Sequence, residues 1–68
     1  MLSVSIAVRT GGTIELQSGI FDDKEAAALI SLMTRSSQVE ATDIIHETRR
    51  WGICRRRADN FEVLTKIL

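Results

Sequence analysis

The sequence predicts a small α+β fold in which a small antiparallel sheet, made of two hairpins with three or four strands, packs against two helices in the order ββααββ. Apolar and polar residues alternate near both ends of the 68-residue chain, as they do in half-buried strands. Between residues 22 and 52, apolar residues recur every three or four positions instead, as on the buried side of a helix. We expect residues 1–68 to form a single compact domain.

The first alternating segment predicts a β-hairpin that turns at Gly11-Gly12. A two-residue loop would pair Val8 with Glu15 and mix apolar with polar positions, whereas a three-residue loop, Thr10–Gly12, pairs Val8 with Ile14. Because a one-residue slip turns every side chain to the other face, we expect the three-residue loop, with its last glycine in the left-handed conformation. The second strand would then contribute three large side chains to the core, namely Ile14, Leu16 and Ile20.

Two helices are predicted in the middle of the chain from their capping residues. Asp22 stands three residues before Glu25, and Ser37 stands three residues before Glu40, which is the spacing of a capping box at a helix start. A short polar break separates the two helices. Gly52 follows the second apolar stripe, where a helix commonly ends in the left-handed conformation.

The C-terminal segment predicts a second hairpin between residues 53–57 and 61–68. Its three-residue loop, Ala58–Asn60, would place Asn60 in the left-handed conformation and set Arg56 opposite Glu62. In the alternative interpretation residues 60–68 form a helix, which leaves a sheet of three strands.

The predicted core combines the apolar positions of all these elements. Trp51 ends the stripe of the second helix, so we expect it to anchor the core rather than to form an exposed stacking platform. A chain this short buries a limited share of its surface, and unpaired sheet edges invite a second copy, so we expect a homodimer. The expected core residues are Val4, Ile6, Val8, Ile14, Leu16, Ile20, Leu29, Ile30, Met33, Ile44, Ile45, Trp51, Ile53, Phe61, Val63 and Ile67.

Composition excludes several classes of protein and site. A single cysteine and a single histidine cannot build a disulfide framework or a four-ligand zinc site, and we expect no cofactor. The sequence has no apolar run long enough to span a membrane, and with its low cysteine content this predicts a cytoplasmic protein. Asp43 and His46 are interpreted as a solvated helix face, and Cys54 as an inert thiol, so we expect a protein that is not an enzyme.

The net charge of zero is a cancellation between two parts of the chain. Residues 1–48 carry three cationic and seven anionic side chains, whereas residues 49–68 carry six cationic and two anionic ones. Five of the seven arginines lie between residues 49 and 57, with a tryptophan among them. Arginine suits phosphate and carboxylate contacts, and it stacks on aromatic rings. The candidate partner-binding residues are therefore Arg49, Arg50, Trp51, Arg55, Arg56 and Arg57.

Two functions follow from this pattern. We expect a small protein-binding module, such as an adaptor, an inhibitor or an assembly factor, because the chain offers no catalytic constellation and carries complementary charges. The alternative is a small regulator that binds DNA or RNA through the cluster of residues 49–57. A helix-turn-helix is disfavoured because the second helix is acidic in its first half.

Overall fold

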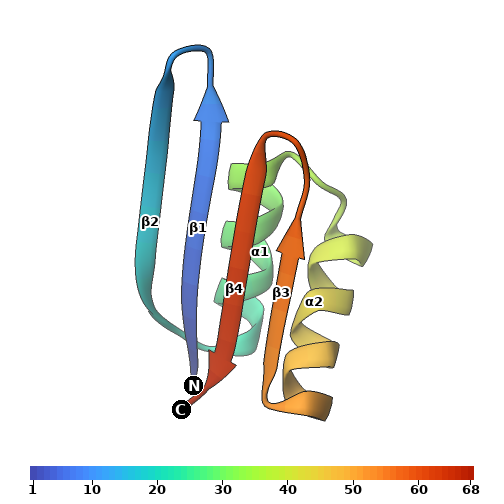
Figure 1. Cartoon of the computed structure of the whole chain (residues 1–68). Helices are drawn as coiled ribbons and strands as arrows, with labels where there is room; N and C mark the ends of the chain where they lie inside the picture. The colour runs from blue at the N-terminus through green and yellow to red at the C-terminus, as the bar shows by residue number, and fades with distance from the viewer.

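The computed structural model describes residues 1–68 and has the predicted α+β fold. Its sheet is antiparallel throughout, with the strand order β2-β1-β4-β3, and both helices lie on one side of it (Figure 1). The two central strands, β1 and β4, bring the first and last residues of the chain together, and the Leu68 N–H donates to the Met1 carbonyl. The elements are β1 (Leu2–Thr10), β2 (Thr13–Phe21), α1 (Asp23–Thr34), α2 (Gln38–Trp51), β3 (Ile53–Arg57) and β4 (Phe61–Ile67).

Both helices begin where their capping residues predict, and α2 also ends at its predicted cap. The Asp22 carboxylate accepts a hydrogen bond from the Glu25 N–H at 2.7 Å, and the Ser37 hydroxyl accepts one from the Glu40 N–H at 3.1 Å. Gly52 ends α2 in the left-handed conformation, with φ of 84°. These local bonds satisfy backbone groups that would otherwise be unpaired at the helix ends, which is why sequence spacing alone locates them.

The first hairpin has the predicted strands but not the predicted register. Thr10 pairs with Thr13 and Val8 with Glu15, so the loop is the two residues Gly11-Gly12. Only Gly11 has a left-handed φ, 61°, which matches a turn that needs glycine at its first central position. The prediction of a three-residue loop with a left-handed Gly12 was therefore wrong, because a tight turn outweighed the match of apolar residues across the pair.

The second hairpin confirms the strand interpretation of the C-terminal segment and again differs by one residue in register. Arg57 pairs with Glu62, and Arg56 with Val63, so the predicted pairing of Arg56 with Glu62 was wrong. The loop is also tighter than predicted, because the Ala58 N–H donates to the Phe61 carbonyl at 2.9 Å. Asn60 is not left-handed, since Arg35 is the single non-glycine residue with a positive φ.

The core lies between the helices and the central strands. Every second residue of β1 points toward the helices, and three small residues, Ala26, Ala27 and Ala41, let the helix backbones approach the sheet and each other. The sequence pattern puts Ala26 and Ala41 on the apolar stripes of the helices, but the predicted core omitted all three alanines. The buried apolar residues are Leu2, Val4, Ile6, Val8, Ala26, Ala27, Ile30, Ala41, Ile44, Ile45, Cys54 and Val63.

Six residues predicted for the core are exposed instead. Three of them, Ile14, Leu16 and Ile20, lie on β2. In the observed register their side chains point away from the helices, and each exposes 60% or more of its surface. Trp51 is the last residue of α2 and is 68% exposed. A further three predicted residues, Leu29, Met33 and Phe61, pack against the core while partly buried. The remaining exposed ones are Ile53 on the helix-free side of β3 and Ile67 near the chain end.

Candidate functional site

The arginine cluster of the sequence does not form one patch in the structure. Arg49 lies on α2 and pairs with Asp23 of α1, with its Nε donating at 3.0 Å and a second guanidinium nitrogen bonding the other carboxylate oxygen. This hydrogen bond holds the pKa of the Asp23 carboxyl below its ordinary value and raises the pKa of the Arg49 guanidinium. Arg49 thus links the two helices on the exposed surface.

The three arginines of β3 divide between the two sides of the sheet, because neighbouring residues of a strand point in opposite directions. Arg56 points toward the helices and lies 3.9 Å from Glu40 of α2. Arg55 and Arg57 point away from the helices, and Arg57 pairs with Glu62 of β4 at 2.9 Å. Three of the five clustered arginines therefore have a carboxylate of the same chain as their partner.

Arg50 and Trp51 form a separate exposed pair at the C-terminal end of α2. The Arg50 guanidinium lies over the Trp51 ring, 5.1 Å from its centroid. Such a cation–π contact at an exposed position is worth about 0.5–1 kcal/mol. The pair belongs to α2, whereas the other exposed arginines of the cluster belong to β3.

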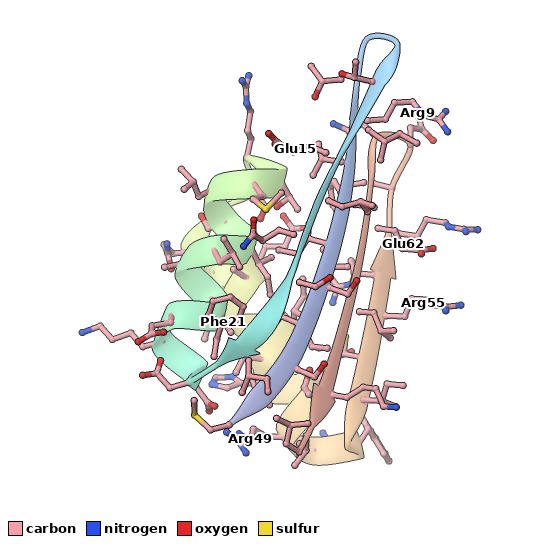
Figure 2. All side chains as sticks on the ribbon, turned by 90° about the vertical axis from the view of Figure 1, so that its left-hand side faces the viewer. Arg9, Glu15, Phe21, Arg49, Arg55 and Glu62 are labelled. Carbon is pink, nitrogen blue, oxygen red and sulfur yellow. The ribbon has the colours of Figure 1, made fainter.

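The side of the sheet that faces away from the helices carries four of the ten large apolar side chains that are exposed, Ile14, Leu16, Ile20 and Ile53. We call it the open face; Arg9, Arg55 and Glu62 mark it in Figure 2, where they project on the side opposite the helices. Its apolar residues come from all four strands, while the open-face side chains of β1 are small except for Arg9. They are Ile14, Leu16 and Ile20 of β2, Ala7 of β1, Leu64 of β4 and Ile53 of β3.

The open face is also cationic. It carries four cations, Arg9, Arg55, Arg57 and Lys66, against the single carboxylate of Glu62. The carboxylates of the helices and their caps lie on the other side, at Asp22, Asp23, Glu25, Glu40, Asp43 and Glu47. The open face therefore has a net positive charge, whereas the helix side carries these carboxylates together with the cations Lys24, Arg35, Arg49, Arg50 and Arg56.

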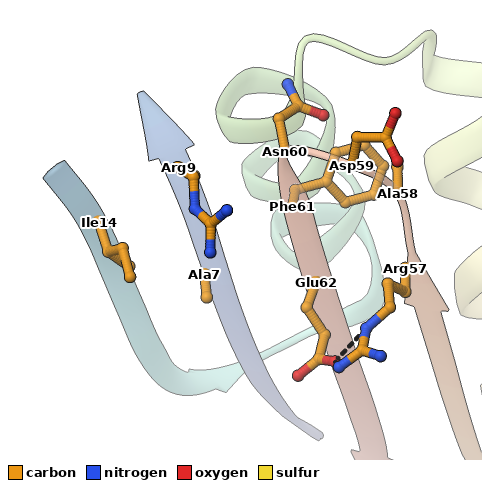
Figure 3. A pocket seen from close by; sticks show the side chains of 9 residues that line it. All are labelled: Ala7, Arg9, Ile14, Arg57, Ala58, Asp59, Asn60, Phe61 and Glu62. Atoms are coloured by element: carbon orange, nitrogen blue, oxygen red, sulfur yellow. Dashed lines mark hydrogen bonds and ion pairs between the residues drawn. The ribbon is translucent and has the colours of Figure 1, made fainter. Parts of the chain in front are cut away.

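A shallow pocket of about 330 Å³ opens between the loop of the second hairpin and the end of β1 (Figure 3). Arg9 and Ile14 line it on one side, and Arg57 and Glu62 on the other. Arg57 and Glu62 form an ion pair at 2.9 Å, so the guanidinium of Arg9 is the cation in this pocket with no carboxylate partner. The pocket extends the open face toward the hairpin loops.

The remaining candidate groups stay isolated. Cys54 is buried and lies 3.5 Å from a carboxylate oxygen of Glu47, and burial, followed by this contact, raises the pKa of the thiol. A raised pKa keeps the sulfur protonated and lowers its nucleophilicity at neutral pH. Asp43 and His46 are exposed on α2. No three side chains of His, Cys, Asp or Glu lie together as a group that could hold a metal ion.

Sequence reasoning found two open-face cations of β3 and missed the apolar residues of β2, at the opposite edge of the same face. Arg55 and Arg57 were among the predicted binding residues, whereas Ile14, Leu16 and Ile20 were assigned to the core. The signal that could have found them is the Gly11-Gly12 pair, which favours a two-residue turn and thereby sets the register. No helix is long and apolar enough to cross a membrane. Comparison of this chain with protein-family models, characterised proteins and solved structures finds no match, so the open face itself carries the functional argument.

Proposed function

We propose that this chain is a small, non-enzymatic protein-binding module, an adaptor, inhibitor or assembly factor that acts by surface contact through the open face. One observation carries the proposal: the large apolar side chains of β2 project into solvent from a rigid sheet, at 61% exposure for Ile14 and 71% for Leu16. Exposed apolar patches rimmed by polar groups are typical of protein interaction sites.

The chemistry of the open face defines the kind of partner. Apolar residues of β2 provide area to bury, and small residues of β1, Ser3, Ser5 and Ala7, leave room for side chains of the partner. Arg55 of the edge strand β3 and Lys66 of the neighbouring strand β4 have no carboxylate partner within the chain, and both lie across β1 from the apolar residues of β2. A protein surface with an apolar centre and an acidic rim complements this arrangement.

The test is site-specific photocrosslinking in the native host. A photoreactive phenylalanine derivative replaces Leu64, at the centre of the open face, and in a matched variant it replaces Val39, which is 73% exposed on α2. We expect position 64 to capture a discrete protein and position 39 not to capture it. The purified partner should then bind the Leu64→Asp and Arg55→Glu variants at least tenfold more weakly, while Val39→Asp binds as the unmodified chain does.

Two outcomes would contradict the proposal. One is a partner whose binding is lost in Val39→Asp and retained in Leu64→Asp, which would move the contact to the helices. The other is tight binding of labelled duplex DNA or single-stranded RNA, with a steep loss between about 50 and about 200 mM salt. Loss of that binding on changing Arg55, Arg56 and Arg57 together to Ala would assign the chain to nucleic-acid regulation instead.

A further inference from the structure

Strand β2 is a long, unprotected sheet edge. None of its nine residues is buried, it contains no proline, and its one charged residue is Glu15. β2 forms one edge of the sheet, beyond β1, and Figure 1 shows the hairpin of β1 and β2 rising past the end of the helices. Natural sheets usually blunt such an edge with charges, proline or a short strand. The absence of these devices indicates that another strand covers β2.

The hydrogen-bonding pattern identifies which residues of β2 offer free backbone groups. The Arg9 N–H donates to the Asn60 carbonyl at 2.7 Å, so Arg9 bonds on the β4 side of β1. Backbone groups alternate along a strand, so the neighbours Val8 and Thr10 bond toward β2, where they pair with Glu15 and Thr13. The residues of β2 whose N–H and C=O groups point outward are therefore Ile14, Leu16, Ser18 and Ile20.

We propose that two copies of this chain associate by antiparallel pairing of β2 with β2, centred on Gln17. This register uses every outward-facing residue, because Ile14 lies opposite Ile20 of the second copy and Leu16 opposite Ser18. Glu15, the only charge, lies opposite Gly19, which has no side chain, so no like charges meet. A shift of two residues in either direction leaves an isoleucine without a backbone partner.

The other edge strand, β3, is less suited to pairing with itself than β2 is, which explains why a second copy would pair through β2. Strand β3 has five residues, and three of them are arginines. Pairing β3 with itself about its centre would set Arg55 against Arg55, and like charges directly opposite each other are destabilising. The short, cationic β3 is thus a protected edge, whereas β2 is self-complementary.

The dimer completes the open face. A twofold axis perpendicular to the sheet keeps the helices of both copies on the same side, so the two open faces join across the axis. Ile14 of one copy then adjoins Ile20 of the other, and the apolar margin of each face becomes the centre of a single larger face. This association does not depend on the proposed function, because it concerns the strand edge rather than the partner.

Paired proline variants test the edge. Ser18→Pro removes an outward N–H from β2 without removing a bond to β1, and Arg55→Pro is the matched change on the edge of β3. By light scattering from micromolar to millimolar concentration, the unmodified chain should reach twice 7.6 kDa. Arg55→Pro should do the same, and Ser18→Pro should remain monomeric with an unchanged circular dichroism spectrum. A single 7.6 kDa species throughout for the unmodified chain, or dissociation by Arg55→Pro alone, would overturn the proposal.

Cysteine crosslinking tests the register in a Cys54→Ala background. Gln17 lies opposite its own copy at a non-hydrogen-bonded position, where the Cα atoms of antiparallel strands are about 4.5 Å apart, within reach of a disulfide. Gln17→Cys should therefore oxidise to a covalent dimer. Thr13→Cys, which would lie opposite Phe21, should not. Crosslinking at Thr13 in preference to Gln17 would overturn the register, and loss of the Gln17 crosslink on adding Ser18→Pro would confirm its dependence on the edge.

Discussion

Two buried threonines connect the second helix to the sheet. Thr48 of α2 and Thr65 of β4 are completely buried, and their hydroxyls share a hydrogen bond. Thr48 also donates to the Ile44 carbonyl at 2.8 Å, whereas the other contact of Thr65, with the Cys54 carbonyl, is longer at 3.4 Å. The two hydroxyls therefore depend on each other, and no side-chain oxygen or nitrogen is left unpaired in the core.

A double-mutant cycle measures this dependence. Thr48→Val leaves the Thr65 hydroxyl with only its long contact to the Cys54 carbonyl, so we expect the free energy of unfolding to fall by about 1–3 kcal/mol. Thr65→Val leaves the Thr48 hydroxyl bonded to the Ile44 carbonyl, so we expect the free energy of unfolding to fall by about 1 kcal/mol. The double variant replaces both hydroxyls with methyl groups and should cost less than the sum of the two changes. Urea unfolding checks the cycle, and strict additivity would contradict the coupling.

Cys54 gives the stability a dependence on alkaline pH. Burial, followed by the contact with Glu47, raises the pKa of the thiol above the ordinary 9.0 that it has in the unfolded chain. Below pH 9.0 the thiol is protonated in both states and its contribution is fully present. Above that value the unfolded chain releases the proton first, so the thiol's contribution falls as pH rises toward the folded pKa.

The measurement compares unfolding of the unmodified chain and of Cys54→Ala at about pH 8 and about pH 10. Both proteins share the titration of lysine, so the difference between their losses reports the thiol. We expect the unmodified chain to lose more stability on this change in pH. Equal losses would show that the thiol titrates normally in the folded protein.

At the scale of the elements, the helices could be predicted closely because their boundaries depend on local bonds. Asp22 and Ser37 cap backbone groups only three residues away, and Gly52 ends α2 by its own backbone conformation. Strand register could not be predicted as well, because it joins distant residues and depends on turns of two or three residues. Matching Val8 with Ile14 assumed that both strands of the first hairpin bury the same side, whereas no residue of β2 is buried.

The corrected turn predicts that substitutions at the two adjacent glycines have different effects on stability. Gly11 has a φ of 61°, in the left-handed region, and Gly12 does not; a Cβ at either position would meet nothing within 4 Å. Gly11→Ala should therefore destabilise the chain by about 1–2 kcal/mol through backbone strain alone. Gly12→Ala should change stability by less than about 0.5 kcal/mol. The reverse order in thermal or urea unfolding would favour the three-residue loop.

At the scale of the whole molecule, strand alternation divides the arginines of β3 between the two sides of the sheet. The predicted cluster of residues 49–57 could be found from composition, but its division could not be seen until α2 and β3 were placed. Arg55 and Arg57 reach the open face, whereas Arg49 and Arg56 neutralise helix carboxylates. The strand register decides whether the apolar residues of β2 face the helices or solvent. The predicted register was wrong, which is why sequence reasoning placed these residues in the core.

The arrangement of the strands also predicts that the chain can be reconnected. β1 and β4 are antiparallel neighbours, and a hydrogen bond joins Leu68 to Met1, so a short glycine-rich linker can close the ends without crossing the sheet. A circular permutant that begins at Gly12 and ends at Gly11 keeps every pairing of the sheet except the turn of the first hairpin. We expect it to fold with native circular dichroism and cooperative unfolding, at a lower stability because β1 and β2 are no longer joined by a tight turn. A matched permutant opened within α2, between Asp43 and Ile44, interrupts the helix beside the core and should fail to unfold cooperatively. Failure of the permutant that begins at Gly12 to fold cooperatively would contradict the prediction that the adjacent chain ends permit reconnection.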